Sequence, residues 1–387
     1  MIQGEPPNGR QIGSPGQLGF LSPNLLPSIE LRLRQCHSII GGDRLGRALG
    51  KWSGTSAGRG LRDQLEHAEW EGFRFYDLIF PLFMFLVGAV LPFSLQRFRR
   101  DGDAAAYRRI ARRTALLFGL GLLCNGILQF DWEGLRVAGV LQRIALCYGI
   151  AAVIALKGSS RGIAIALAAI LLGYWALLAN VAAPGGRPGD YTMAGNLPGW
   201  VDRQYLPREI KQAYYGFGDN EGLLSTIPAV ATAHMGVLAG RWLRSGHGPW
   251  KKVGGLIVAG ASAVVVGELW GLRFPIIKNL WTSSFVLVAG GLSLLLLAAF
   301  YALLDVLRFR RWVFFFAVIG ANAITIYVAP RLIDFPYLAR FFLGGVYRLT
   351  GQYVSGDFRQ VVEAAGVLAA EWLFLHYLYR KRIYLRV

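Results

Sequence analysis

Long apolar blocks are the feature that most constrains how this chain folds. Of its 387 residues, 54% are hydrophobic and only 17% are charged. A helix needs about 20 residues to cross the hydrocarbon core of a bilayer, and in lipid every backbone polar group must be satisfied within its own segment. The sequence therefore predicts an all-α fold, a polytopic transmembrane helix bundle. About nine spans are expected, at 78–95, 111–128, 137–156, 163–183, 223–243, 253–272, 280–303, 312–328 and 360–378.

The distribution of charge sets the expected orientation. A net charge of +18 could indicate a nucleic-acid partner, but the arginines and lysines gather in alternate short loops, such as 97–113, and at the C-terminus. By the positive-inside rule these loops and the C-terminus are cytoplasmic. We therefore expect a multi-pass membrane protein with a cytoplasmic C-terminus, and with the lipid bilayer and not nucleic acid as its partner.

The N-terminal region does not fit this pattern. Residues 1–38 are rich in proline and glycine and show no helical period, which predicts a poorly ordered leader. The alternative is a mis-assigned start, in which the first span is missing or altered and residues 39–42 are the tail of its helix. Residues 39–387 form the expected membrane domain, with a periplasmic loop at 184–222. The three cysteines of the chain show no metal-ligand spacing, and no metal site is predicted.

Titratable residues are concentrated on the side opposite the basic loops. The stretch HAEWEGFRFYDLIFPLFMFLVG (67–88) puts His67 and Asp77 at the extracytoplasmic end of the 78–95 span. The other outward segments contain most of the remaining acids. The positive-inside rule alone thus explains the basic residues of the inward loops, whereas the titratable residues of the outward segments are expected to form a functional site.

Five motifs in one order give the chain a resemblance to a known family. They are HAEWEGFRFYDLIFPLFMFLVG (67–88), RVAGVLQRIALCY (136–148), DNEGLLSTIPAVATAHMGVLAG (219–240), FPIIKNLWTSSFVLVAGG (274–291) and GANAITIYV (320–328). Together they resemble the heparan-α-glucosaminide N-acetyltransferase-like membrane acyltransferases, in their bacterial branch, which implies a location in the bacterial inner (cytoplasmic) membrane. The resemblance implies transfer of an acetyl group from cytoplasmic acetyl-CoA to an amino-sugar or glycan acceptor on the periplasmic side. It also implies that the catalytic residue is the histidine of H-x-x-W-x-G, which is His67 here.

The chemistry of acetyl transfer agrees with a histidine at this position. An amine must lose a proton to attack, and an imidazole can accept it near neutral pH. The imidazole could instead accept the acetyl group and pass it on. Asp77 would orient His67 or bind the amine, or it is simply an acid at a helix N-terminus.

Other candidate residues lie within or beside the predicted spans. Charged or amide groups inside a membrane are costly and usually face a cavity or a partner, so Gln142 and Arg143 are candidates, with an ion pair from Arg143 to Asp77 or Glu221 as the structural alternative. Trp281 could equally belong to an interfacial aromatic belt, and Asn322 could hydrogen-bond a neighbouring helix. The remaining candidates for substrate or cofactor binding are Asp219, Glu221, Thr226 and Lys278.

Two other function classes stay open. A transporter or permease for a sugar or peptidoglycan fragment would also use polar residues inside the membrane. A non-catalytic membrane subunit is the third reading, and a homodimer is compatible with all three. Binding of acetyl-CoA separates the enzyme from both alternatives.

Overall fold

The described part of the chain is helical. The computed structural model describes residues 41–100, 102–132, 135–206, 216–309, 313–350 and 355–385. In these ranges there are helices, turns and one isolated antiparallel bridge, but no strand. The predicted all-α class is therefore confirmed. The leader at 1–38 lies outside the described residues and stays a prediction.

The helices follow the hydropathy of the sequence. Each predicted span matches a helix or, at 312–328, a pair of short helices. The main elements in chain order are α2 (Gly42–Ser53), α3 (Ser56–Gln64), α4 (Ile79–Arg100), α5 (Asp103–Cys124), α6 (Val140–Lys157), α7 (Ser160–Asn180), α8 (Leu197–Tyr205), α9 (Thr226–Arg244), α10 (Pro249–Gly271), α11 (Ser283–Tyr301), α12 (Val313–Ala321), α13 (Ala323–Val328), α14 (Phe335–Thr350) and α15 (Gly356–Arg380).

Fewer helices than expected are long and apolar enough to span a membrane by themselves. Among the described residues there are six, which comprise α4, α6, α7, α10, α11 and α15 with slightly extended bounds. A seventh would be α12 with α13, which are bent by 69° at Asn322. Helix α5 carries several arginines, and α9 contains His234 and many small residues. The helical bundle is thus confirmed, whereas the number of about nine spans stays a prediction.

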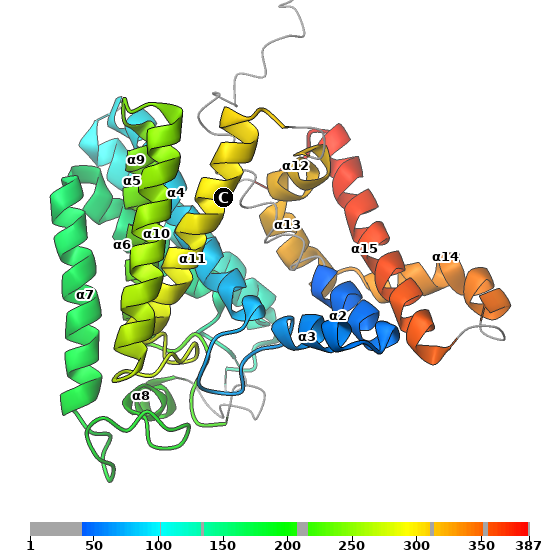
Figure 1. Cartoon of the computed structure of the whole chain (residues 1–387), viewed down its shortest axis with the longest axis horizontal. Helices are drawn as coiled ribbons and strands as arrows, with labels where there is room; N and C mark the ends of the chain where they lie inside the picture. Colours follow the sequence, from blue (N-terminus) through cyan, green and yellow to red (C-terminus); the bar gives the residue numbers. More distant parts are fainter. Residues whose placement is uncertain are drawn as a thin grey trace, which may run out of the picture.

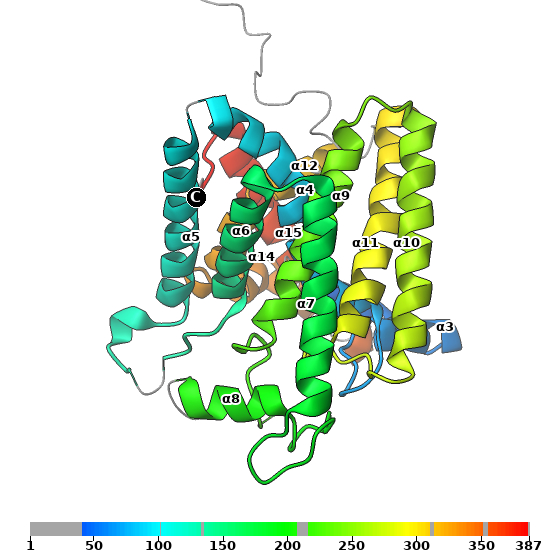
Figure 2. The same cartoon turned by 90° about the vertical axis from the view of Figure 1, so that its left-hand side faces the viewer.

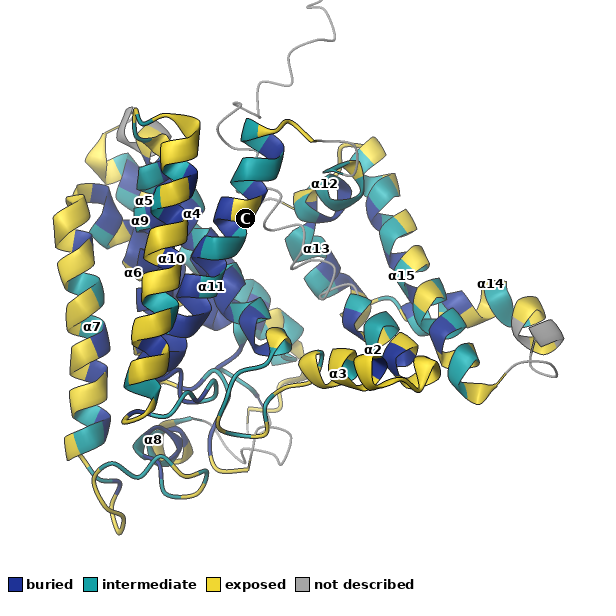
Figure 3. Cartoon of the chain, in the orientation of Figure 1, coloured by how far each residue is buried: buried dark blue, intermediate teal, exposed yellow. Residues whose placement is uncertain are grey.

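Helix α9 lies at the centre of the bundle. Because other helices surround it, it can be less apolar than a helix that faces lipid. It packs against α4, α6, α7 and α11, and most of its residues are buried, whereas α7 and α10 expose one side (Figure 3). Small residues allow the backbones of α4 and α9 to approach closely. A Cβ atom added to Gly236 would lie 1.9 Å from the Phe85 carbonyl oxygen, and one at Gly88 would lie 1.9 Å from that of Ala233.

We therefore expect Gly236→Leu to lower the melting temperature of the purified protein by several degrees. The added side chain must push α4 and α9 apart, and overpacking typically costs about 1–3 kcal/mol. Gly173→Leu on α7 is the matched control, since a Cβ there meets no atom within 4 Å. Equal melting temperatures for the two variants would show that the α4–α9 contact is not needed for stability.

The helices α4–α11 and the remaining helices form two neighbouring groups (Figure 1). In the second group α2 packs against α3 and α15, and α14 also packs against α15. Helix α8 lies across the end of α7 and close to the turn before α9 (Figure 2). The loops at this end of the bundle contain most of the predicted site residues.

Candidate active site

His67 and Asp77 form a hydrogen-bonded pair at the start of α4. His67 Nδ1 lies 2.7 Å from Asp77 Oδ1, while Asp77 Oδ2 accepts hydrogen bonds from the backbone N–H groups of Ala68 and Arg74, each at 3.1 Å. Asp77 is only 1% exposed, whereas His67 is 52% exposed. A carboxylate only accepts hydrogen bonds, so the imidazole donates from Nδ1. Its Nε2 then carries the lone pair and lies 3.3 Å from the ammonium nitrogen of Lys278, which can donate to it.

Lys278 joins this pair from a distant part of the chain. Its ammonium nitrogen lies 3.3 Å from Asp77 Oδ1, 2.9 Å from His67 Nδ1 and 3.3 Å from His67 Nε2. Burial lowers the pKa of Lys278, although the carboxylate of Asp77 opposes this shift. The three side chains have no net charge when the imidazole is neutral, which is its nucleophilic and proton-accepting form.

A short backbone pairing brings Lys278 to the histidine. Glu71 forms an antiparallel bridge with Ile277, and the Gly72 N–H donates to the Ile276 carbonyl at 2.9 Å. Directly after this bridge the chain turns, with the Trp281 N–H bonded to the Lys278 carbonyl at 2.9 Å. Trp281 adopts a φ of 52°, in a region that a bulky residue rarely occupies. Such strain is typical of sites where the surrounding structure fixes a side chain.

A cavity of about 310 Å³ opens beside His67. Its polar end is lined by His67, Lys278, Asn279 and Glu221, and its walls are mostly aromatic and aliphatic. The walls come from α4, α6, α13 and the turn before α11, and include Tyr76, Phe80, Phe83, Val140, Leu141, Ile144, Trp281, Ala323, Ile324 and Tyr327. A site with apolar walls and a few convergent polar groups is typical of small-molecule binding.

The cavity does not continue to the basic end of the bundle. Phe83 and Ile144 are its deepest lining residues on α4 and α6. Beyond them the next turns of α4, α6 and α9 pack together through buried side chains, including Leu91, Tyr148 and Val237. No open conduit between the two ends of the bundle is therefore seen in the described part of the chain. The remaining side of the cavity is the apolar wall that α13 forms.

Arg136 organises the acidic residues on the other side of the cavity mouth. Its guanidinium binds Asp219 through Nε (2.9 Å) and Nη2 (2.5 Å), and it also binds Glu221. Asp202 of α8 accepts the backbone N–H groups of Asp219 (3.2 Å) and Leu223 (2.9 Å). Burial raises the pKa of Asp202 to about 6, against the effect of these two hydrogen bonds. The turn before α9 is thus fixed, and Glu221 reaches the cavity.

Arg143 is buried, but not in the ion pair considered from the sequence. In the structure it donates to the Ser225 hydroxyl and, at 3.3 Å, to the Gly222 carbonyl, and it lies 4.9 Å from the ring centre of Trp281. The structural alternative, an ion pair with Asp77 or Glu221, is not formed because Lys278 pairs with Asp77 and Arg136 pairs with Glu221. Trp281 is 1% exposed and bonds Thr232 at 3.1 Å, so it does not belong to an interfacial belt.

Three further candidates lie away from the cavity. The Gln142 carboxamide points toward Gly121 of α5, and the Thr226 hydroxyl bonds the Gly222 carbonyl at 2.8 Å within its own helix start. Asn322 lies at the break between α12 and α13, where Thr325 Oγ1 is 3.3 Å from its Oδ1. The hydrogen bond expected from Asn322 to a neighbouring helix is therefore replaced by a local one. Of these three, none lines the cavity.

Several residues at the cavity were not predicted as site residues. Arg136 is the first residue of the motif RVAGVLQRIALCY, but in the sequence it marked only the end of an outward loop. Tyr76 packs on His67 with ring centres 4.5 Å apart, and Tyr327 lines the opposite wall. In the sequence, the position of Tyr76 directly before Asp77 is the feature that could have indicated its place in the site. The contact of Tyr327 depends on the bend at Asn322, which hydropathy does not reveal.

Comparison with known proteins confirms the resemblance suggested by the motifs. The human heparan-alpha-glucosaminide N-acetyltransferase is 26% identical over 390 residues, which cover 83% of this chain and 56% of the human protein. The mouse protein of the same name is 26% identical over 394 residues, covering 84% and 58%. The chain thus spans a little over half the length of these curated relatives. No family model matches it.

Proposed function

We propose that this chain, as a relative of heparan-alpha-glucosaminide N-acetyltransferases, is a membrane N-acetyltransferase that works at the His67 cavity. The observation that carries the proposal is the cluster of His67, Asp77 and Lys278 at the mouth of that cavity. It combines a nucleophilic nitrogen, a carboxylate that orients the ring and a nearby cation. The donor is acetyl-CoA, and the acceptor is an amino sugar or glycan.

The chemistry assigned to His67 takes one of two forms. In the direct form, Nε2 removes a proton from the acceptor ammonium, the amine attacks the thioester carbonyl, and the C–S bond breaks. The leaving thiolate takes the proton from the imidazolium, and the acetylated nitrogen loses its extra proton to water. In the covalent form, Nε2 itself attacks the thioester carbonyl and the C–S bond breaks, which expels the thiolate. The neutral amine then attacks the acetyl group, the N–C bond to the imidazole breaks, and the proton that the amine loses passes to the thiolate. Asp77 keeps Nδ1 protonated in both forms. Lys278 lies close enough to stabilise negative charge that develops on the carbonyl oxygen.

The shape of the cavity suits an elongated acyl donor. Phe80, Phe83 and Ile324 give its walls an apolar character, which matches an acetyl group and a hydrocarbon-rich arm. The polar acceptor would approach from the exposed side of His67, near Glu221 and Asn279. Because α4, α6 and α9 pack together below Phe83, a coenzyme that arrives from the cytoplasm does not reach the cavity straight between these three helices. The proposed location of His67 on the periplasmic side follows from the positive-inside rule.

Calorimetry with acetyl-CoA tests this proposal against its rivals. Purified protein in detergent is expected to bind acetyl-CoA saturably, at one site per chain, and Phe83→Trp is expected to weaken this binding by filling the cavity. Phe118→Trp on α5, away from this cavity, is the control. A sugar permease or a non-catalytic subunit would show no saturable heat with acetyl-CoA, and that result would remove the acetyltransferase assignment.

A further inference from the structure

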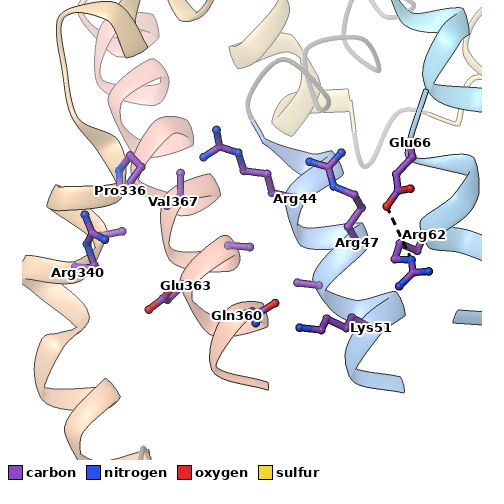
Figure 4. Close-up of a pocket in the computed structure, with 13 residues that line it drawn as sticks. Arg44, Arg47, Lys51, Arg62, Glu66, Pro336, Arg340, Gln360, Glu363 and Val367 are labelled. Atoms are coloured by element: carbon purple, nitrogen blue, oxygen red, sulfur yellow. Dashed lines mark ion pairs between the residues drawn. The ribbon is translucent and has the colours of Figure 1, made fainter. Parts of the chain in front are cut away.

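A second cavity, of about 380 Å³, is surrounded by basic side chains. It lies between α2 and α3 on one side and α14 and α15 on the other (Figure 4). The side chains of Arg44 and Lys51 extend from α2 toward α15. The cationic residues of the lining are Arg44, Arg47, Lys51, Arg62 and Arg340, and the acidic ones are Glu66 and Glu363.

Some of these cations are compensated within the protein. Arg47 pairs with Asp43 at 2.7 Å, Lys51 pairs with Asp357 at 2.9 Å, and Arg62 lies 3.9 Å from Glu66. Arg44 and Arg340 form no ion pair within the described ranges of the chain, although the buried carboxylate of Glu371 acts electrostatically on Arg44. The guanidinium of Arg340 is thus available to a ligand, and that of Arg44 is only partly compensated. A guanidinium presents several N–H donors in a planar fork that matches phosphate oxygens.

The surroundings of the cavity indicate where such a ligand comes from. Helix α14 buries Phe335 and Ala339 but exposes Phe341 and Phe342, of which Phe342 is 77% exposed. It lies across the direction of the spanning helices α4, α7 and α10, as α3 does (Figure 1). Helices that expose aromatic side chains and lie across the bundle axis are typical of the membrane interface. The basic cavity is thus next to a surface suited to lipid chains.

We propose that this cavity binds the phosphate headgroup of an anionic phospholipid, whose acyl chains lie along the exposed aromatic side of α14. Charge complementarity selects the anionic headgroup, and the adjoining apolar surface selects a lipid over a soluble phosphate. Basic pockets between membrane helices are a known form of headgroup site. This assignment does not depend on the acetyltransferase activity.

The site is connected to the candidate active site through two residues. Arg47 lines the basic cavity and pairs with Asp43, and the Tyr76 hydroxyl lies 3.3 Å from Asp43 Oδ2. Tyr76 in turn packs on the imidazole of His67. The lipid would therefore bind on the same side of the bundle as His67.

Native mass spectrometry of the wild-type protein provides the test. We expect phosphatidylglycerol to be retained at least about tenfold better than phosphatidylcholine with the same acyl chains. A photoactivatable phosphatidylglycerol should label α2 and α14 preferentially. Equal retention of the two lipids, or labelling confined to other helices, would overturn the proposal. So would equally tight binding of glycerol 3-phosphate or inorganic phosphate, because the ligand would then be a soluble phosphate compound.

Two double variants separate the site from general surface charge. Arg44→Gln with Arg340→Gln should lower retention of phosphatidylglycerol about tenfold or more, since each basic residue near a membrane contributes about 1 kcal/mol to attraction of anionic lipid. Arg348→Gln with Arg380→Gln removes the same charge from exposed positions outside the cavity and should leave retention within about twofold. Equal losses in both pairs would contradict a defined site. If a variant does not fold, the labelling experiment on the wild-type protein still tests whether the lipid binds at α2 and α14.

Discussion

Replacement of His67 by alanine is expected to reduce acetyl transfer from acetyl-CoA to glucosamine by about a hundredfold to ten-thousandfold, the typical contribution of a positioned base. The loss would be greater still if the imidazole carries the acetyl group. Substrate binding should change little, because most of the cavity wall is formed by other side chains. The measurement is the rate at which labelled acetyl groups appear on the sugar, with purified protein at saturating substrate.

The matched control is His247→Ala, in the loop between α9 and α10. His247 contacts Ser245 and Trp242 but does not line the His67 cavity. Both variants should melt within a few degrees of the wild type, since His67 is largely exposed. An undiminished rate in His67→Ala would mean that another group activates the amine, with Lys278 as the nearest alternative.

Asp77→Asn is expected to lower the turnover rate on the order of a hundredfold or more while the Michaelis constant for acetyl-CoA stays similar. An amide can still accept the N–H groups of Ala68 and Arg74, so the loop geometry should survive. It no longer holds the imidazole with Nδ1 protonated, and loss of the correct tautomer is known to be costly in histidine-based catalysis. The amide also leaves the ammonium of Lys278 without its anionic partner.

Asp63→Asn on α3 is the corresponding control, because Asp63 is exposed and lies 3.7 Å from Arg62 in a solvent-accessible pair. A pH profile gives a second readout for Asp77. If Asp77 acts through the imidazole, the variant should shift the pH dependence of the turnover rate as well as its maximum. A variant with normal turnover and an unchanged profile would reduce Asp77 to a helix-start carboxylate with a structural role.

The sequence predicted those features of the structure that depend on one local property, such as hydropathy or a short separation along the chain. Long apolar stretches predict helices because backbone groups in lipid must bond within their own segment, and the helices were found where these stretches lie. His67 and Asp77 could be selected together because only ten residues separate them and they precede one span. Their contact at 2.7 Å follows from the short loop between them.

Partners that meet across the fold could not be predicted. Lys278 lies 211 residues from His67 in the chain, and its position depends on the bridge between Glu71 and Ile277. An ion pair with Asp77 or Glu221 was the structural alternative for Arg143, but Lys278 pairs with the first carboxylate and Arg136 with the second. Such choices between equivalent charges are decided by tertiary geometry. Periodicity alone also does not reveal that Asn322 breaks its helix.

In the function proposed for this chain, acetyl groups pass from acetyl-CoA to an amine at the His67 cavity. An assay with the purified wild-type protein in lipid nanodiscs, labelled acetyl-CoA and glucosamine, followed by chromatography of the sugar, tests this transfer. We expect labelled N-acetylglucosamine that increases with enzyme concentration, saturates with both substrates and is lost in His67→Ala. Tight binding of acetyl-CoA without any labelled sugar or labelled protein would contradict it.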